Sequence, residues 1–231
     1  ISLAGNFWNL AQPVFAIKGQ QPNGTNVVYF LNGTRRIKVN RDNNTVIENI
    51  TTATAAYGRP ALFEGSWYLA RGDVINAVRL VIGNGAGVDE AALVSIGVTA
   101  NHFATIQDES TAKLARVRVQ NVMDLSPDGT DWTGADFEIG DTSFYVTDLL
   151  ESQGELVVIR PDGPRRFDPS GVSLPIQKFV SANQQTSVNE GANSYSHGTF
   201  VYWVSLSGLW RIASDYIVPV GFEADPQFFS T

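Results

Sequence analysis

The sequence predicts an all-β fold, a β-propeller with about five visible four-stranded blades that is closed by itself or part of a larger ring. Two observations predict this class: a strand-forming composition and an internal repeat. Hydrophobic residues make up 43% of the 231 residues and aromatic residues 11%, whereas charged residues make up only 17%. The usual charged share is about a quarter. Few charges with many β-branched and aromatic side chains favour sheets over surface helices.

The repeat consists of an apolar run, a turn with a glycine, and then an arginine before an apolar residue. This is the layout of a β-hairpin. Its clearest copies are VVYFLNGTRRIKV at 27–39, LVVIRPDGPRRFDP at 156–169 and FVYWVSLSGLWRIAS at 200–214. With two weaker copies between the first two, the repeated arginines are Arg36, Arg79, Arg116, Arg166 and Arg211. Their spacings of 43, 37, 50 and 45 residues match the period of a propeller blade.

The repeat divides one predicted domain, residues 1–231, into five units. Their approximate bounds are 10–52, 53–98, 99–141, 142–187 and 188–231. A four-stranded sheet cannot bury both of its faces alone, so each unit needs neighbours to stack on. In the fourth unit the strands are expected at Tyr145–Leu150, Glu155–Arg160, Arg165–Asp168 and Leu174–Val180. The second unit is the weakest, because Val88–Ile96 could also form a helical turn.

Ring closure in propellers usually joins the first strand to the last blade. The candidate segments here are Val14–Lys18 and Ile217–Val220. We expect the five repeated arginines to be structural, because an arginine at a fixed blade position usually pairs with a carbonyl, an acid or an aromatic face. A functional ring of five arginines would be unusual in a chain of net charge −7.

The charge balance excludes several classes of function. The net charge is −7, the isoelectric point is about 4.8, and no basic cluster exceeds two adjacent arginines. Nucleic-acid binding needs a positive surface against phosphate, so we expect no nucleic-acid partner. No apolar run approaches the roughly 20 residues of a membrane span. Without cysteine, and with only two histidines, the chain offers little to a metal, and we expect no metal site and no cofactor.

Two motifs suggest chemistry but are better explained as turns and loops. The stretch Ser126–Trp132 (SPDGTDW) resembles the Asp-box of sialidases, yet it is one residue short and occurs once. Its Pro-Asp-Gly step is a turn signal by itself. The glycine-rich Gly83–Gly87 is followed by Val88 where the G-x-G-x-x-G fingerprint needs its third glycine, and it lacks the βαβ context of a dinucleotide site. We therefore predict an inter-strand loop there.

Carboxylates are the strongest enzyme candidates. Glycosidases use two of them, about 5 Å apart for retention and farther apart for inversion. The acids near predicted inner strands are Glu64, Asp108, Asp148 and Glu151. Their separations do not follow from the sequence, and most acids in such a chain solvate turns. There is also no G-x-S-x-G elbow and no thiol nucleophile. We expect no enzymatic activity.

Binding candidates come from the histidines and from the loops. His102 and His197 each precede the arginine of their unit by 14 residues, which predicts comparable places in two units. The loops 108–113 and 183–196 are expected to face a partner. The predicted binding residues are His102, His197, Asp108, Glu109, Asn193 and Tyr195.

One region resembles a known family. FEIGD at 137–141, VTDL at 146–149 and GELVVIRPDG at 154–163 resemble the propeller repeats of tailed-bacteriophage tail proteins. Trp132 and NHFA at 101–104 extend the likeness, which covers about 57–215.

The resemblance implies a non-enzymatic virion component, tail-associated, in an extracellular particle. Its partners would be other virion or tail proteins, with a host surface glycan or receptor as a further possibility. We expect an oligomeric assembly and no membrane insertion. The residues leave open a glycan-binding lectin or a glycosidase-type propeller.

Overall fold

The computed structural model describes fourteen stretches of the chain, and everything below refers to them. They are residues 8–9, 12–21, 23–51, 56–71, 78–81, 93–96, 98–108, 111–119, 121–167, 173–175, 194–197, 200–205, 208–213 and 216–220. Within these stretches there is no helix, and hence none that could cross a membrane. The all-β prediction is confirmed.

The strands form five antiparallel sheets, each made of four consecutive strands. The first sheet contains β1 (Val14–Gln20), β2 (Asn26–Asn32), β3 (Arg35–Asn40) and β4 (Val46–Thr51). The second contains β5 (Ala61–Phe63), β6 (Ser66–Leu69), β7 (Val78–Val81) and β8 (Leu93–Ser95). The third contains β9 (His102–Asp108), β10 (Thr111–Val119), β11 (Val122–Ser126) and β12 (Phe137–Glu138).

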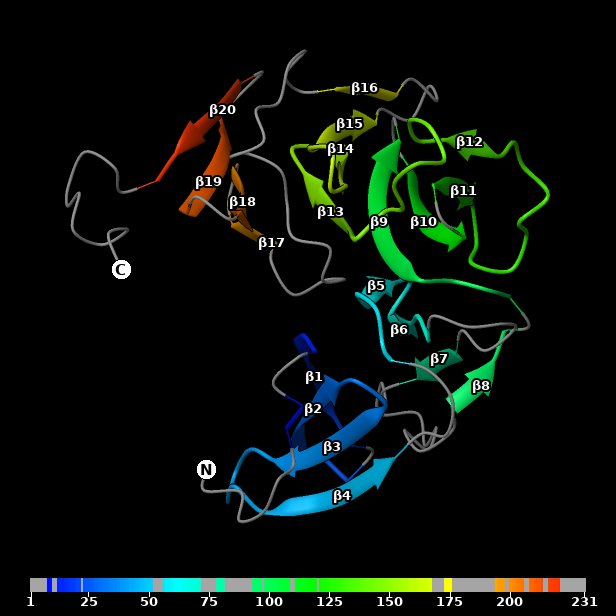
Figure 1. Cartoon of the computed structure of the whole chain (residues 1–231). Coiled ribbons are helices and arrows are strands. Elements are labelled where there is room, and N and C mark those ends of the chain that lie inside the picture. Colours follow the sequence, from blue (N-terminus) through cyan, green and yellow to red (C-terminus); the bar gives the residue numbers. More distant parts are fainter. Residues whose placement is uncertain are drawn as a thin grey trace.

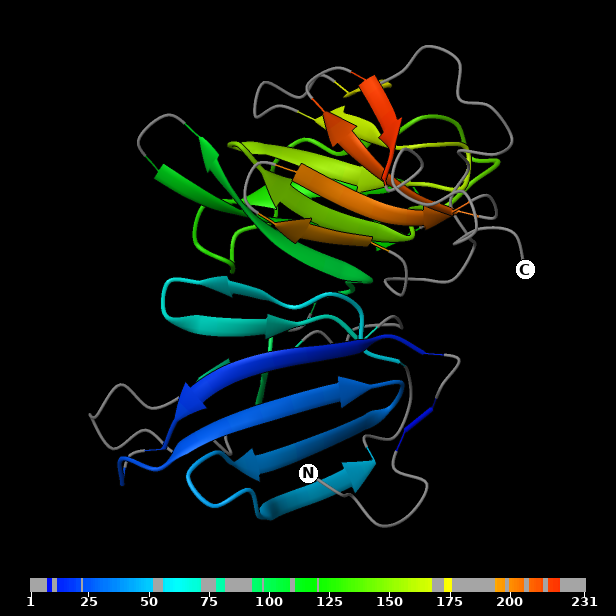
Figure 2. The same ribbon diagram turned by 90° about the vertical axis from the view of Figure 1, so that its left-hand side faces the viewer.

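The fourth sheet contains β13 (Asp148–Ser152), β14 (Glu155–Ile159), β15 (Arg165–Phe167) and β16 (Ser173–Pro175). The fifth contains β17 (Ser194–His197), β18 (Phe200–Ser205), β19 (Gly208–Ala213) and β20 (Tyr216–Pro219). In Figure 1 the sheets follow one another in an arc, and the first strand of each lies innermost. Figure 2 shows the same sheets from the side, with the first sheet at one end of the stack.

Two equivalent hairpins show how local sequence sets the strand pairing. Glu64 and Gly65 join β5 to β6 with φ angles of 48° and 72°, and Gln153 and Gly154 join β13 to β14 with φ angles of 57° and 82°. Two consecutive positive φ angles match the twist of the flanking strands. Glycine adopts this conformation without a steric penalty, so it stands second in both turns.

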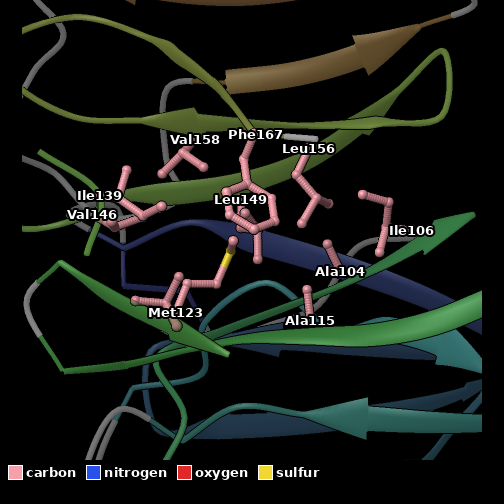
Figure 3. Close-up of a cluster of buried hydrophobic side chains, with 11 residues drawn as sticks. Ala104, Ile106, Ala115, Met123, Ile139, Val146, Leu149, Leu156, Val158 and Phe167 are labelled. Atoms are coloured by element: carbon pink, nitrogen blue, oxygen red, sulfur yellow. The ribbon is translucent and has the colours of Figure 1, made fainter. Parts of the chain in front are cut away.

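Four apolar cores hold neighbouring sheets together. Phe15, Tyr29 and Leu69 belong to the core between the first and second sheets, and Phe63, Tyr68 and Phe103 to the next. Figure 3 shows the core between the third and fourth sheets, where Met123 and Ala115 face Leu149, Leu156 and Phe167. Leu150, Val157, Val201 and Trp203 form the core between the fourth and fifth sheets. Alternate residues of β13 therefore serve both neighbours, as the two faces of a strand require.

The two ends of the arc do not stack on each other through an apolar core within the described residues. The closure segments predicted from the sequence were wrong. The first, Val14–Lys18, lies in β1 and pairs with β2, while the second, Ile217–Val220, overlaps β20, which pairs with β19. Each segment pairs with the adjacent strand of its own sheet, and within the described residues neither pairs with the opposite end of the chain.

Four of the repeated arginines share one strand position, as predicted, and Arg116 differs. Arg36, Arg79, Arg166 and Arg211 lie on the third strands of their sheets, namely β3, β7, β15 and β19. Arg116 lies on β10, the second strand of the third sheet, opposite Phe103 of β9. This one-strand offset explains the uneven spacings of 37 and 50 residues on either side of Arg116. In the second sheet, β8 shows that Leu93–Ser95 is a strand and not a helical turn.

The region that resembles phage proteins forms a tight contact between the third and fourth sheets. The fully buried Arg160 donates hydrogen bonds to the backbone oxygens of Ile139 and Asp141. Gly140 lies between them at φ 69°, and a Cβ there would sit 2.6 Å from Arg160 Nη1. The glycine is therefore required both by its backbone conformation and by the close approach of the guanidinium.

The packing gives a first test. Trp203 is fully buried against the fourth sheet, while its neighbour Val204 is 48% exposed on the opposite face of β18. We expect Trp203→Ala to lower the free energy of unfolding by about 3–5 kcal/mol and Val204→Ala to change it by less than about 0.5 kcal/mol. Denaturant unfolding of the isolated chain measures both. Equal losses in the two variants would contradict the assignment of the faces.

Candidate functional site

Four polar residues meet where the inner strands begin. Arg59 stands two residues before β5, and His102, Asp148 and Ser194 are the first residues of β9, β13 and β17. Their spacings along the chain are 43, 46 and 46 residues. Three of the four therefore occupy the same place in the repeat, and Arg59 lies two residues ahead of that place in the second sheet. We call Arg59, His102, Asp148 and Ser194 the axial cluster.

An ion pair lies at the centre of the axial cluster. Arg59 Nε lies 2.6 Å from Asp148 Oδ1, and Arg59 Nη2 lies 2.6 Å from Asp148 Oδ2. Arg59 Nη2 also donates to the backbone oxygen of Ser194 at 2.9 Å. Asp148 accepts further hydrogen bonds from the Ser194 hydroxyl and, at 2.8 Å, from the backbone N–H of Leu149. Such a bidentate pair is strong and fixes the orientation of the guanidinium.

His102 connects the third sheet to the cluster. Its Nδ1 accepts a hydrogen bond from the backbone N–H of Arg59 at 3.3 Å, and the backbone N–H of Phe103 donates to the oxygen of Arg59 at 2.9 Å. The neutral ring therefore carries its proton on Nε2. His102 Nε2 is buried and has no hydrogen-bond partner among the described residues. Burial and the nearby Arg59 charge lower the pKa of His102 to about 4, although Asp148 acts in the opposite direction.

Both members of the ion pair stay charged. Burial acts to raise the pKa of Asp148, but the charge and hydrogen bonds of Arg59, with help from His102 and Ser194, hold that pKa below its usual value. Burial acts to lower the pKa of Arg59, and Asp148 raises it above its usual value. The Arg59–Asp148 pair is therefore neutral as a unit. It ties the second sheet to the fourth and, through Ser194, to the fifth.

A cavity of about 490 Å³ opens beside the axial cluster. Its walls come from the first, second and fifth sheets and include Phe15, Arg59, Trp67, Ser194 and Tyr195. We call it the arc-end cavity, because it brings β1 and β17 together from the two ends of the arc. A second, smaller cavity of about 250 Å³ lies along β5, β9 and β13 and includes Arg59 and Glu151.

The carboxylates considered for glycosidase chemistry do not form a catalytic pair. Each one is held by another group or lies away from the axial cluster. Asp148 is held by Arg59, and Glu151 accepts a hydrogen bond from the Gly154 backbone in the β13–β14 turn. The side chains of these two acids point to opposite faces of β13, because the residues are three apart on one strand. Glu64 occupies the β5–β6 turn, and Asp108 ends β9, so both lie at the other ends of their strands from the axial cluster. Among the described residues, no group of three or more histidines and acids could hold a metal ion.

The predicted binding residues do not form one site. His102 is buried at the start of β9, whereas His197 ends β17, is exposed and stacks on Tyr195 at a ring separation of 6.2 Å. The predicted equivalence of the two histidines was therefore wrong, because the arginines used to align them lie on different strands. Tyr195 lines the arc-end cavity. Glu109, Asn193, the segment Gly83–Gly87 and residues 183–193 of the second predicted contact loop lie outside the described residues, whereas most of the first loop belongs to β9 and β10.

The repeated arginines contact acids and aromatic rings. Arg36 pairs with Glu48 at 2.7 Å, and Arg166 pairs with Glu155 at 2.8 Å. Arg211 lies 4.8 Å from the centre of the Phe200 ring. Arg116 has two such contacts, to Asp124 at 2.7 Å and to the Trp132 ring at 4.3 Å. The side chain of Arg79 is outside the described part of the structure.

The Asp-box-like stretch is a hydrogen-bonded turn on the third sheet. Asp128 Oδ1 accepts from the backbone N–H groups of Thr130 and Asp131 at 2.7 and 2.8 Å, and these bonds lower the pKa of Asp128 to about 2. Trp132 Nε1 donates to the Gly129 oxygen at 3.2 Å. Trp132 packs against the core between the second and third sheets. The acid therefore organises a turn, and its side chain is directed to local backbone.

Arg59 and Ser194 were missed by the sequence analysis, and the available signal was the register of the inner strands. The repeat was aligned on the arginines of the central hairpins, where one unit is offset by a strand. Alignment on the first residue of each inner strand would have placed His102, Asp148 and Ser194 in one column, with Arg59 two positions before the first residue of β5.

Comparison with known proteins extends the description of the fold. The sequence matches no protein-family model and no curated protein. Among solved structures, streptogramin B lyase is similar with a TM-score of 0.57 at 11% identity, over 90% of this chain and 71% of that chain. Virginiamycin B lyase from Staphylococcus aureus is similar with a TM-score of 0.57 at 11% identity, over 88% and 69%. These neighbours are propeller-type proteins. The chain has a propeller-type fold.

A third similar structure is a chain of the nidogen/laminin complex, with a TM-score of 0.51 at 10% identity, over 83% of this chain and 74% of that chain. Two of these neighbours are lyases and one belongs to a protein–protein complex. At 10–11% identity the likeness shows the fold alone, because one fold supports many unrelated functions.

The ion pair gives a second test. In Asp148→Asn the side chain keeps its shape, but the largely buried Arg59 loses its counter-charge. We expect this variant to lower the free energy of unfolding by about 3 kcal/mol. Asp136→Asn breaks a more exposed pair with Arg118, in which the acid is 51% exposed, and serves as the matched control. Its expected cost is less than about 1 kcal/mol. Similar costs in the two variants would show that the axial pair does not hold the sheets.

The buried histidine gives a third test. Its folded-state pKa of about 4 lies below the ordinary 6.5. Between these values the unfolded chain binds a proton that the folded chain excludes, so stability falls as the pH falls through this window. We expect a loss of about 3 kcal/mol from pH 6.5 to pH 4.

His102→Asn retains an acceptor near Nδ1 and should remove most of this pH dependence, measured by denaturant unfolding across that range. The exposed His197 provides the control, and His197→Asn should leave the dependence in place. An unchanged pH profile in His102→Asn would contradict the assignment.

Proposed function

We propose that this chain is a non-enzymatic structural and binding module of a tailed-phage particle, associated with the tail. Its propeller-type fold offers a rigid surface to other virion proteins, and it forms part of an oligomeric assembly. The observation that carries the binding role is an apolar sheet face at the end of the arc.

The face belongs to the fifth sheet and is turned away from the fourth. We call it the open face. Its residues are paired across β17, β18 and β19, so their side chains share one side: Tyr195, His197, Phe200, Tyr202, Val204, Leu209 and Arg211. Tyr195 is 62% exposed and Val204 is 48% exposed. Exposed apolar patches of this kind mark interaction sites.

The chemistry of the open face matches that of protein interfaces. Aromatic residues and arginine are enriched at such interfaces, where they supply large contact areas. Phe200 and Tyr202 meet edge to face at 6.2 Å, and Arg211 lies over Phe200. The side chains are therefore arranged before a partner binds, which reduces the entropy cost of association.

The non-enzymatic part of the proposal is supported by the engagement of Asp148. Its carboxylate is bound to Arg59, Ser194 and the Leu149 backbone, and the Arg59 charge holds it ionised. The phage assignment is supported by the sequence resemblance over residues 57–215.

Particle association tests the proposal. The phage that encodes the chain is grown with an epitope-tagged copy, and purified particles are examined by immunogold electron microscopy. We expect label at the tail. A chain absent from purified particles would overturn the assignment.

A variant of the open face tests the binding surface in the same assay. Val204→Asp places a charge on the open face, and incorporation into particles should fall at least tenfold. Ile47→Asp changes an equally exposed apolar residue on β4 of the first sheet, 46% exposed, and is the matched control. Normal incorporation of Val204→Asp would show that the open face is not the attachment surface.

A further inference from the structure

The arc-end cavity has the dimensions of a small-molecule site. Its volume of about 490 Å³ lies within the roughly 300–1,000 Å³ typical of ligand pockets. Its walls combine apolar β1 residues, aromatic rings and a few polar groups, which is the usual composition of such sites. The cavity is distinct from the open face, although Tyr195 contributes to both.

Aromatic side chains from three sheets line the cavity. Phe15 comes from β1, Trp67 from β6 and Tyr195 from β17. Trp67 is held in place by a hydrogen bond from its Nε1 to the Lys18 oxygen at 3.4 Å. Tyr195 is 62% exposed, so its ring is available to a ligand without prior rearrangement. Rigid aromatic rings provide contact area at a low entropy cost.

Arg59 is the polar group that is held ready at the cavity wall. Its Nε and Nη2 are used by Asp148 and Ser194, whereas its Nη1 has no hydrogen-bond partner within the described part of the chain. The side chain is 20% exposed. Because Asp148 and the Phe15 ring, 5.3 Å from the guanidinium, fix its position, the two Nη1 hydrogens form a preoriented donor pair.

The charge balance decides what kind of ligand suits this donor pair. Among the described residues that line the cavity, Arg59 is the one charged side chain, and Asp148 directly behind it compensates its charge. A carboxylate or phosphate bound at Nη1 would feel the repulsion of Asp148 at close range. A neutral acceptor, such as a hydroxyl or an amide oxygen, would bind without that penalty.

We propose that the arc-end cavity binds a neutral sugar residue of a glycan. One face of the sugar ring stacks on Tyr195, and a hydroxyl or acetamido oxygen accepts from Arg59 Nη1. The Ser194 hydroxyl is committed to Asp148, so it holds the strand in place and leaves the direct contact to Arg59. Sugars present both an apolar ring face and oxygen acceptors at the ring edge, which fits this pairing of an aromatic ring with a donor pair.

Titration of the isolated chain tests the site. The probes are N-acetylglucosamine, galactose, lactose and diacetylchitobiose, each followed by saturation-transfer NMR and by tryptophan fluorescence. We expect saturable binding of at least one of these neutral sugars. Glucuronic acid and N-acetylneuraminic acid form the acidic arm, and they should bind at least tenfold more weakly. No saturation by any neutral sugar, or tighter binding of the acidic arm, would overturn the proposal.

Variants then localise the binding. Tyr195→Ala removes an exposed ring and should weaken sugar binding at least tenfold, while Tyr145→Ala, at a residue that is 39% exposed outside the cavity, should not. Arg59→Lys keeps a cation for Asp148 but loses the free donor pair, and it should also weaken binding, with thermal unfolding as the check on folding. Should Arg59→Lys not fold, Tyr195→Ala decides alone. Unchanged affinity in Tyr195→Ala would place the sugar elsewhere. Because these measurements use the isolated chain, their outcome is independent of particle association.

Discussion

The Arg59–Asp148 ion pair is the interaction on which the arrangement of the sheets depends. It joins residues 89 positions apart, and the same guanidinium reaches Ser194, 135 positions away. Each of these groups stands at the start of an inner strand, where four sheets converge. A buried pair of this kind costs desolvation and is favourable only with full hydrogen bonding. Asp148 meets that condition through Arg59, Ser194 and the Leu149 backbone.

The sheets themselves depend on apolar stacking. Each hairpin is specified locally, as the Glu64–Gly65 and Gln153–Gly154 turns show, but a single four-stranded sheet leaves a face exposed. Four apolar cores bury these faces where neighbouring sheets pack against each other. At the end of the arc, the aromatic face of the fifth sheet that is turned away from the fourth sheet stays exposed. The arc-end cavity is lined by β1, β17 and Arg59. The surfaces available for binding therefore lie where the stacking stops.

Much of the architecture could be predicted from the sequence, because the determinants of a hairpin are local. The apolar runs and glycine turns located five units, and in the fourth unit the strands at Glu155–Ile159 and Arg165–Phe167 lie where they were expected. The register of the third unit was not predictable in the same way. Arg116 lies within the long β9–β10 hairpin, and its place on the second strand depends on pairing with Phe103. The predicted closure also failed, because pairing across the chain depends on how the sheets stack and has no local signal in either segment.

The sequence by itself determined the all-β class, the blade-sized repeat and the turns, since these depend on strand propensity, glycine conformation and the period of apolar residues. Only the tertiary structure decided the candidate site. Arg59 and Asp148 have no local signature, and their roles come from four sheets bringing distant strand ends together. The same convergence buried His102 with no partner for Nε2 among the described residues and placed Arg59 at a cavity wall. Distances across an axis are set by packing, and no spacing along the chain encodes them.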